Sequence, residues 1–230
     1  MDTLKGIPIL SAMSDEQLED FAKRCTWRNY EAGELIIDHQ EDSNDVRFII
    51  SGSVRIVMRM IEGREVIFND FDTGSFFGEV SAIDGGTRSA NVSAITRTRL
   101  CVMPQAIFKQ LCIEVPEIGW NVMIHLANMV RILSDRLSEF TFLKAKHRLY
   151  AELLRLSKKR ANNPDQRIIS PTPPQAEIAD RISSRREIVS REMKTLEREG
   201  LLSRERGGLV LLDPERLSNL AAEGWLGSAQ

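Results

Sequence analysis

The 230-residue chain has few cysteines and no long apolar run, and each shortage excludes a class of protein. The three cysteines, Cys25, Cys101 and Cys112, are odd in number and form no Cys-x-x-Cys pair, so we expect neither an iron–sulfur cluster nor a structural zinc site. No apolar run approaches the ~20 residues of a membrane-spanning helix. Residues 1–11 also lack the basic and apolar blocks of a signal peptide. We therefore expect a cytoplasmic protein without a metal.

The motifs of common enzyme classes are also missing. The sequence contains no P-loop, no His-Glu-x-x-His and no paired metal ligands. Its three histidines, His39, His125 and His147, are scattered, which favours surface or packing roles over ligation of a haem. We therefore assign no catalytic residue and expect a binding protein rather than an enzyme.

The charges are nearly balanced over the whole chain but are unevenly distributed along it. The total is 31 basic against 33 acidic residues. Residues 1–143 carry 14 basic and 21 acidic groups, whereas residues 144–230 carry 17 basic and 12 acidic groups. An acidic first part and a basic second part indicate that nucleic acid would be bound by the C-terminal part alone.

The first half of the chain has the patterning of a small β-structure. Ser14-Asp15-Glu16-Gln17 predicts a capping box that opens a short helix ending near Arg24. Six short β-like runs follow, separated by turn-forming residues: Leu35–Ile37, Val46–Ile50, Val54–Met60, Glu65–Phe71, Ala90–Ile95 and Arg99–Met103. Many short strands of this kind indicate a sandwich or a roll that closes its own edges.

Helical periodicity replaces the strand pattern after Pro104. A short helix is predicted over Gln105–Cys112, and a long one from Pro116 to about Thr141. Apolar residues recur every three or four positions along the long helix, close to a heptad repeat, at Ile118, Val122, Leu126, Met129, Leu133, Leu137 and Phe140. This stripe fits either a helix that lies on the sheet or a helix that pairs with a second copy of itself, and the spacing favours the pair.

The basic C-terminal part contains a candidate helix-turn-helix. After a predicted helix from Ala145 to about Arg160 and a loop-rich interval, helices are predicted over Gln175–Ile182 and Arg185–Glu199. The polar face of the second helix combines donors for guanine with an acceptor for cytosine, and consists of Arg185, Arg186, Glu187, Ser190, Arg191 and Lys194. This face suits the major groove of DNA, although a solvated charged face would show the same pattern. A hairpin wing and a short helix over Pro214–Ala222 are predicted to follow.

A glycine–glutamate–arginine cassette is the most informative stretch of the β-rich part. Phe76-Phe77 leads into Gly78-Glu79, and Arg88 lies nine residues after Glu79. An arginine can bind a singly charged phosphodiester through two hydrogen bonds, a glutamate can accept from a ribose hydroxyl, and a glycine lets the backbone approach closely. An isolated cassette would more simply be a surface ion pair, so the other motifs decide between the two interpretations.

Together these motifs resemble the cAMP receptor protein / fumarate-nitrate regulator (Crp/Fnr) family of bacterial transcription factors over nearly the whole chain. Gly78-Glu79…Arg88-Ser89-Ala90 looks like that family's cyclic-nucleotide signature, and the stretch from Glu177 to Leu202 is similar to its helix-turn-helix. The implied fold class is α+β. It has a cyclic-nucleotide-binding, jelly-roll-like β-roll over 1–115, a dimerisation helix over 116–143, and a winged helix-turn-helix DNA-binding domain over 144–230.

The resemblance implies roles for single residues of the cassette. It implies that Glu79 accepts from the ribose 2′-hydroxyl and that Arg88 binds the cyclic phosphate. Ser89 and the backbone at Gly78 and Val80 would assist. The effector so implied is cAMP, with cGMP as the alternative.

The resemblance also implies partners. Arg186, Glu187 and Arg191 match base-reading positions of the cAMP-activated members, which implies a homodimer on a TGTGA-like inverted repeat in double-stranded DNA. Residues 161–167 match a candidate contact with RNA polymerase, and no membrane is implied.

One position departs from the family's pattern. Members that sense cAMP place a Thr-Ser pair on the central helix against the adenine, where this chain has Leu133-Ser134. Ser134 stays a candidate ligand residue. The oxygen-sensing branch does not fit, because residues 1–24 contain no cysteine. The alternative function is a ligand-independent DNA-binding regulator of the same family.

Overall fold

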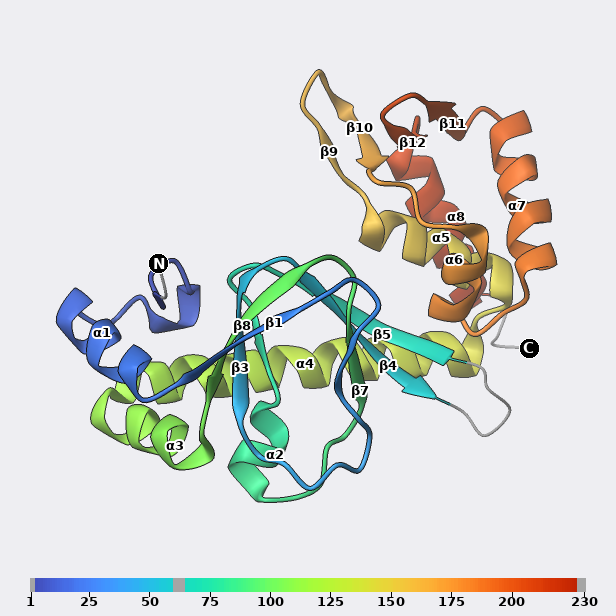
Figure 1. Ribbon diagram of the computed structural model, residues 1–230. Helices are drawn as coiled ribbons and strands as arrows, with labels where there is room; N and C mark the ends of the chain where they lie inside the picture. Colours follow the sequence, from blue (N-terminus) through green and yellow to red (C-terminus); the bar gives the residue numbers. More distant parts are fainter. Residues whose placement is uncertain (1–2, 60–64, 227–230) are drawn as a thin grey trace. The chain divides into compact units, whose positions relative to one another are not determined.

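The computed structural model describes residues 3–59 and 65–226. They form two compact units, which divide between Val130 and Arg131, and Figure 1 shows the elements of each in chain order. Met60, which the sequence placed at the end of a strand, lies outside the described residues. No helix in the described ranges has the length and apolarity needed to cross a membrane.

The first unit begins with a 3-10 turn over Pro8–Leu10 and helix α1 over Asp15–Lys23. The predicted capping box is confirmed. The Ser14 hydroxyl accepts from the Gln17 N–H at 3.2 Å, and the Gln17 side-chain oxygen accepts from the Ser14 N–H at 2.9 Å. Two donors at the helix start are thereby satisfied by local side chains.

Two four-stranded antiparallel sheets form the β-roll. One has the order β1-β8-β3-β6 and the other β2-β7-β4-β5. The bounds are Thr26–Tyr30 (β1), Leu35–Ile37 (β2), Val46–Ser51 (β3), Ser53–Arg59 (β4), Glu65–Asp72 (β5), Phe76–Phe77 (β6), Asn91–Ala94 (β7) and Thr98–Met103 (β8). All six predicted runs are strands. The sequence pattern missed β1, whose side chains are largely exposed, and β6, which is too short to show a period.

The central strand β3 packs on both faces, and this fixes the roll between two apolar clusters. Phe48 belongs to a cluster that includes Phe21 of α1, Phe108 of helix α3 (Gln105–Glu114) and Ile118 of helix α4 (Pro116–Phe142). The next residue, Ile49, belongs to the cluster between the two sheets. Consecutive side chains of a strand point to opposite faces, so one strand contributes to both clusters. Helix α2, Glu79–Asp84, follows β6 directly.

Helix α4 has two different apolar stripes. Ile118 and Val122 are buried in the core of the β-roll, so this part of the helix lies on the sheet. The prediction that these two residues belong to a pairing seam was wrong. Other large apolar residues of the helix are exposed, namely Trp120, Met123, Ile124, Val130, Ile132, Leu133, Leu137 and Phe142. Four of these, Trp120, Met123, Val130 and Leu137, follow a second line of the helix. Both stripes have spacings of three, four or seven, and burial alone separates them.

The second unit consists of helices α5 (Ala145–Leu156), α6 (Gln175–Arg181), α7 (Arg186–Arg198) and α8 (Pro214–Leu226), with a sheet of order β11-β12-β10-β9. Its strands are Lys158–Arg160 (β9), Asn163–Ile169 (β10), Leu202–Glu205 (β11) and Gly208–Leu211 (β12). The predicted wing is the β11–β12 hairpin. The predicted extension of α5 to Arg160 was wrong, because Lys158–Arg160 turns back on β10. Both strands are mainly polar, and an apolar period was therefore missing.

Candidate functional site

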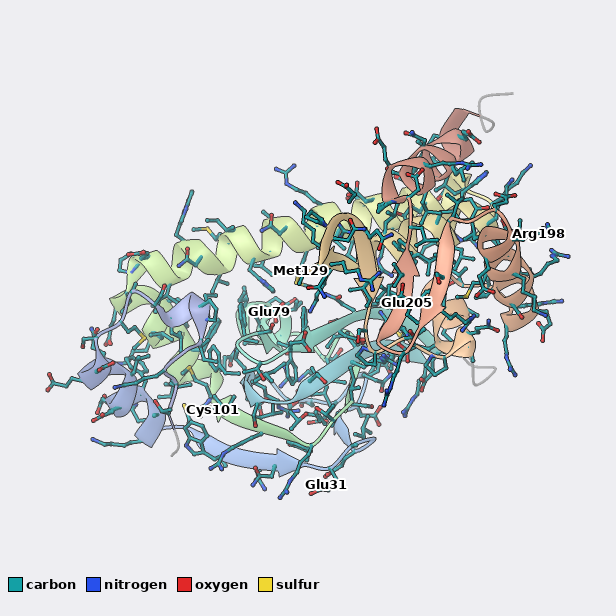
Figure 2. All side chains as sticks on the ribbon, turned by 90° about the horizontal axis from the view of Figure 1, so that it is seen from above. Glu31, Glu79, Cys101, Met129, Arg198 and Glu205 are labelled. Carbon is teal, nitrogen blue, oxygen red and sulfur yellow. The ribbon has the colours of Figure 1, made fainter. Side chains whose placement is uncertain are left out.

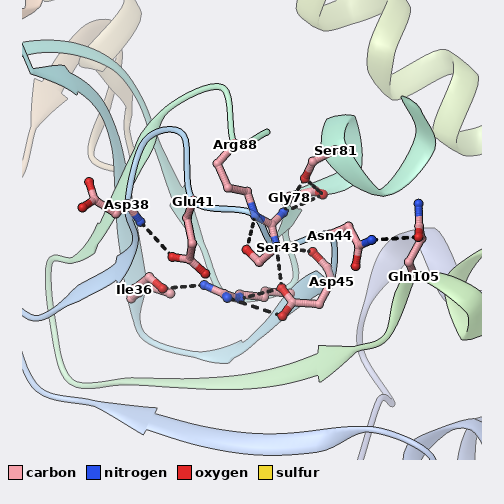
Figure 3. A network of polar contacts seen from close by, with 11 residues as sticks. Ile36, Asp38, Glu41, Ser43, Asn44, Asp45, Gly78, Ser81, Arg88 and Gln105 are labelled. Carbon is pink, nitrogen blue, oxygen red and sulfur yellow. Dashed lines mark hydrogen bonds and ion pairs between the residues drawn. The ribbon is translucent and has the colours of Figure 1, made fainter. Parts of the chain in front are cut away.

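Arg88 lies at the centre of a polar network in the β-roll and is only 3% exposed (Figure 3). Its Nε donates to Ser43 Oγ at 2.8 Å, and its Nη1 donates to the Gly78 carbonyl at 3.0 Å and to Ser81 Oγ at 2.7 Å. Its Nη2 donates to the carbonyl and to Oδ1 of Asp45, at 2.9 and 2.7 Å. A guanidinium has five N–H donors, and these contacts use all of them.

The Asp45 carboxylate is shared between two buried arginines. Besides Arg88, it accepts from Arg47 Nε at 2.9 Å and from Arg47 Nη2 at 3.4 Å. Burial lowers the pKa of the Arg88 guanidinium, and the Asp45 charge opposes that shift. One carboxylate therefore offsets part of the cost of burying two positive charges.

Gly78 makes the close packing of this network possible. Its φ is +85°, and a Cβ atom there would lie 2.6 Å from Arg88 Nη1 and 2.8 Å from the Asp45 carbonyl oxygen. A side chain would meet both a strained backbone conformation and a clash. Glycine is therefore required at the turn from β6 into α2, as the cassette predicted.

Glu79, the first residue of α2, has a buried carboxylate that forms few polar contacts with the rest of the protein. It is 3% exposed, and within the described part of the chain it has no side-chain hydrogen bond. His125 of α4 lies beside it, with its Nε2 3.6 Å from Glu79 Oε1. Figure 2 shows Glu79 beside the ribbon of α4. The carboxylate therefore keeps acceptor capacity that no hydrogen bond from the described side chains uses.

His125 is the functional candidate that the sequence reasoning missed. Its ring packs on Phe76, with the ring centroids 4.6 Å apart, and its Nε2 is buried without a hydrogen-bond partner in the described ranges. The available signal was its place three residues after Val122, on the same helix face as the residues that enter the roll core.

The other residues predicted at the pocket differ in their positions. Arg88 donates to the carbonyl of Gly78, and Glu79 is the next residue in the chain. Gly78, Glu79 and Arg88 therefore meet at one turn. Val80 is 36% exposed and Ser89 is exposed. Ser134 is exposed on α4 and belongs to the second unit.

The predicted DNA-reading face lies on α7, whose opposite side is buried. Val189, Met193 and Leu196 are at most 1% exposed and anchor the helix in the second core. Ser190 is half-buried. The five charged candidates are exposed, namely Arg185, Arg186, Glu187, Arg191 and Lys194. None of these five makes a side-chain hydrogen bond or ion pair to the described residues. Figure 2 shows side chains projecting from this helix, with Arg198 labelled near its end.

The turn before α7 explains how a helix-turn-helix forms here without glycine. Ser183 has a φ of +46°, a left-handed conformation that glycine adopts more readily. The Ser184 N–H donates to the Ala179 carbonyl at 2.9 Å and stabilises the turn. Unpaired charges on the exposed side of α7 are therefore held on a rigid support, as DNA contacts require.

Comparison with known proteins finds one family model over the β-roll and a second over the C-terminal unit. Residues 27–114 match the cyclic nucleotide-binding domain, and residues 147–220 match the Crp-like helix-turn-helix domain. The cAMP-activated global transcriptional regulator CRP of Haemophilus influenzae is 30% identical over 191 residues, which cover 82% of this chain and 84% of that protein.

Solved structures show the same fold. A CooA mutant from Carboxydothermus hydrogenoformans has a TM-score of 0.75 at 20% identity and covers 86% of this chain and 88% of its own. The c-di-GMP responsive global regulator CLP of Xanthomonas campestris has a TM-score of 0.72 at 23% identity and covers 86% and 99%.

A cyclic nucleotide-binding domain is followed by a Crp-like helix-turn-helix, in the order and over the length of the relatives. The chain is therefore a DNA-binding transcription regulator and not an enzyme, and it belongs to the Crp/Fnr family.

Proposed function

We propose that this protein is a cAMP-responsive, homodimeric transcription regulator of a bacterial cytoplasm that binds a TGTGA-like inverted repeat. One observation carries the proposal: a buried carboxylate with free acceptor capacity, Glu79, and a buried guanidinium, Arg88, meet at one turn. A ribose hydroxyl and a phosphodiester are the groups that such a pair recognises. The cAMP-activated relative from Haemophilus influenzae supports cAMP as the effector, and cGMP is the alternative.

The ribose contact can be tested by calorimetry with cAMP and 2′-deoxy-cAMP. Because a hydrogen bond to a charged group contributes about 1.5–3 kcal/mol, we expect the wild type to bind cAMP about 10- to 100-fold more tightly than the deoxy compound. Glu79→Gln should bind the two compounds with similar affinity. Asp84→Asn, at the exposed end of the same helix, is the control and should discriminate as the wild type does.

Two results would reject this assignment. Discrimination that survives in Glu79→Gln would remove the carboxylate from the ribose contact. A wild-type protein that binds neither cAMP nor cGMP would reject a purine cyclic nucleotide as its effector. Ser89, Val80 and Ser134 stay proposed ligand contacts that alanine variants in the same assay would test.

Dimerisation is proposed through the exposed stripe of α4. Trp120, Met123, Val130 and Leu137 are 61, 54, 63 and 68% exposed, and their spacing of three, seven and seven is that of a heptad seam. Leu137→Glu should weaken the dimer in sedimentation equilibrium. Ile113→Glu, which changes an equally exposed residue of α3, should not. A wild-type protein that is monomeric at micromolar concentration would reject the homodimer.

Regulation requires that the nucleotide bind the DNA-competent conformation more tightly than the other. We infer that occupation of the roll changes how α4 presents the two recognition helices of a dimer. Band shifts on a TGTGA inverted repeat and on a scrambled duplex, each with and without cAMP, test this. Equal affinity for the two duplexes would reject the proposed half-site. We also propose that residues 161–167, around the β9–β10 turn, contact RNA polymerase.

A ligand-independent regulator is the second candidate, and one observation favours it. All five donors of Arg88 already bind acceptors of the protein. Undiminished binding to the operator in the absence of nucleotide, together with calorimetric silence toward cAMP and cGMP, would establish this candidate instead.

A further inference from the structure

A phosphodiester can reach Arg88 only by replacing an acceptor that the protein supplies. The five donors face Ser43, Ser81, the Gly78 carbonyl and two atoms of Asp45. The serine hydroxyls and the backbone carbonyls are neutral, whereas the Asp45 carboxylate carries the same charge as a cyclic phosphate. A charged acceptor forms the stronger bond with a guanidinium, so Asp45 and the phosphate compete for the same group.

Asp45 is also the acceptor whose departure the structure accommodates. Its Oδ1 lies 2.7 Å from Arg88 Nη2, but the carboxylate also accepts two bonds from Arg47. A carboxylate that leaves Arg88 therefore keeps a cationic partner and avoids the large cost of an unpaired charge in a buried place. About a quarter of the side chain, 26%, is exposed, so solvent can take up the vacated lone pair.

The charge of the cluster favours an arriving anion. Two buried guanidiniums, Arg47 and Arg88, pair directly with one carboxylate, that of Asp45, so these three side chains together carry one positive charge. Glu41 interacts electrostatically with both arginines, but it is exposed and its charge is screened by water and salt. A singly charged phosphodiester would neutralise the cluster.

We propose that Asp45 is a built-in competitor for the effector's phosphate: its carboxylate occupies Arg88 until the nucleotide displaces it onto Arg47. Asp45 thereby sets the nucleotide concentration at which the regulator responds. The inference rests on the proposed binding of a cyclic nucleotide at Arg88 and concerns the regulation of that same site.

Calorimetric titration with cAMP, and in parallel with cGMP, tests the competitor in Asp45→Asn. The amide has the size of the carboxylate and lacks its charge, so the nucleotide no longer displaces a charged acceptor. We expect binding about 10- to 100-fold tighter than that of the wild type. Asp70→Asn is the matched control, because Asp70 pairs with Arg55 in the same roll at 2.8 Å and is 28% exposed. Its affinity should equal that of the wild type.

A second variant guards against a folding defect. Asp45→Asn leaves two buried guanidiniums without their carboxylate, whereas Asp45→Asn/Arg47→Gln restores the single excess positive charge of the wild-type cluster. Circular dichroism and thermal unfolding establish that each variant is folded. The double variant should show the same gain in affinity as the single one.

The outcomes separate this proposal from the proposed function. Wild-type binding that becomes weaker, or stays unchanged, in both Asp45 variants would overturn the competitor and leave the effector assignment standing, since Asp45 would then only position Arg88. Binding by the Asp45 variants alone would support the competitor and reject cAMP as an effector of the wild type. Absence of binding in all four proteins would overturn both proposals.

Discussion

The carboxylate of Glu152 in α5 offers a quantitative test of what holds the second unit together. It is 1% exposed and lies between three arginines. Arg136 Nη2 is 3.5 Å from its Oε2, Arg181 Nη1 is 3.8 Å from its Oε1, and Arg155 pairs with it at closer range. The side chains of Arg136 and Arg181 are 8 and 3% exposed, so most of this cluster has little access to water.

The expected cost of Glu152→Gln follows from this burial. Removing one partner of a buried ion pair costs about 3–5 kcal/mol, because the remaining charge stays in a place with little water. Arg155 adds little, since its side chain is 35% exposed. Arg181 keeps a second partner, Glu177, at 3.0 Å. These two facts place the loss near the lower limit, at about 3 kcal/mol.

Urea unfolding followed by circular dichroism measures this loss. With a denaturant slope of roughly 2 kcal/mol per molar urea, a loss of about 3 kcal/mol moves the midpoint of the second unit down by about 1.5 M. Glu205→Gln is the control, because its pair with Arg160 is 38 and 28% exposed and is worth at most about 1 kcal/mol. A Glu152→Gln midpoint no lower than that of Glu205→Gln would refute the reasoning. The cost of removing these buried charges from water would then offset the whole free energy of their pairing.

Three further predictions concern the pocket, the pH dependence and the DNA face. Gly78→Ala should lower the free energy of unfolding by about 1–3 kcal/mol and weaken nucleotide binding, because its Cβ would lie 2.6 Å from Arg88 Nη1. An unchanged free energy of unfolding would contradict that close approach. Burial and two neighbouring lysines lower the pKa of His147 from its usual 6.5. The unfolded chain therefore takes up this proton first, and the free energy of unfolding should fall as the pH drops below 6.5. In His147→Gln that fall should be shallower, and parallel curves for the two proteins would exclude the effect. In band shifts, Glu187→Ala should relax base preference, whereas Lys194→Ala should weaken binding to all sequences alike; the same selectivity in both variants would reject the distinction.

Local signals in the sequence were sufficient to predict most of the helices and strands. The capping box at Ser14, the six strand runs and the two helices around Ser183 depend on neighbours within a few residues, and these neighbours are visible in the chain itself. The β9–β10 hairpin was missed because its polar strands are held by backbone pairing, which leaves no apolar period.

The partners of the candidate site could not be derived in the same way. The cassette identified Gly78, Glu79 and Arg88, but nothing near them in the sequence indicates that Asp45, 43 residues earlier, binds the guanidinium, or that His125 lies beside the carboxylate. The two apolar stripes of α4 also have similar spacing, and only packing against the roll shows which one is buried. Periodicity and capping act between neighbours along the chain. Burial and ion pairing instead depend on which distant segments the fold brings together.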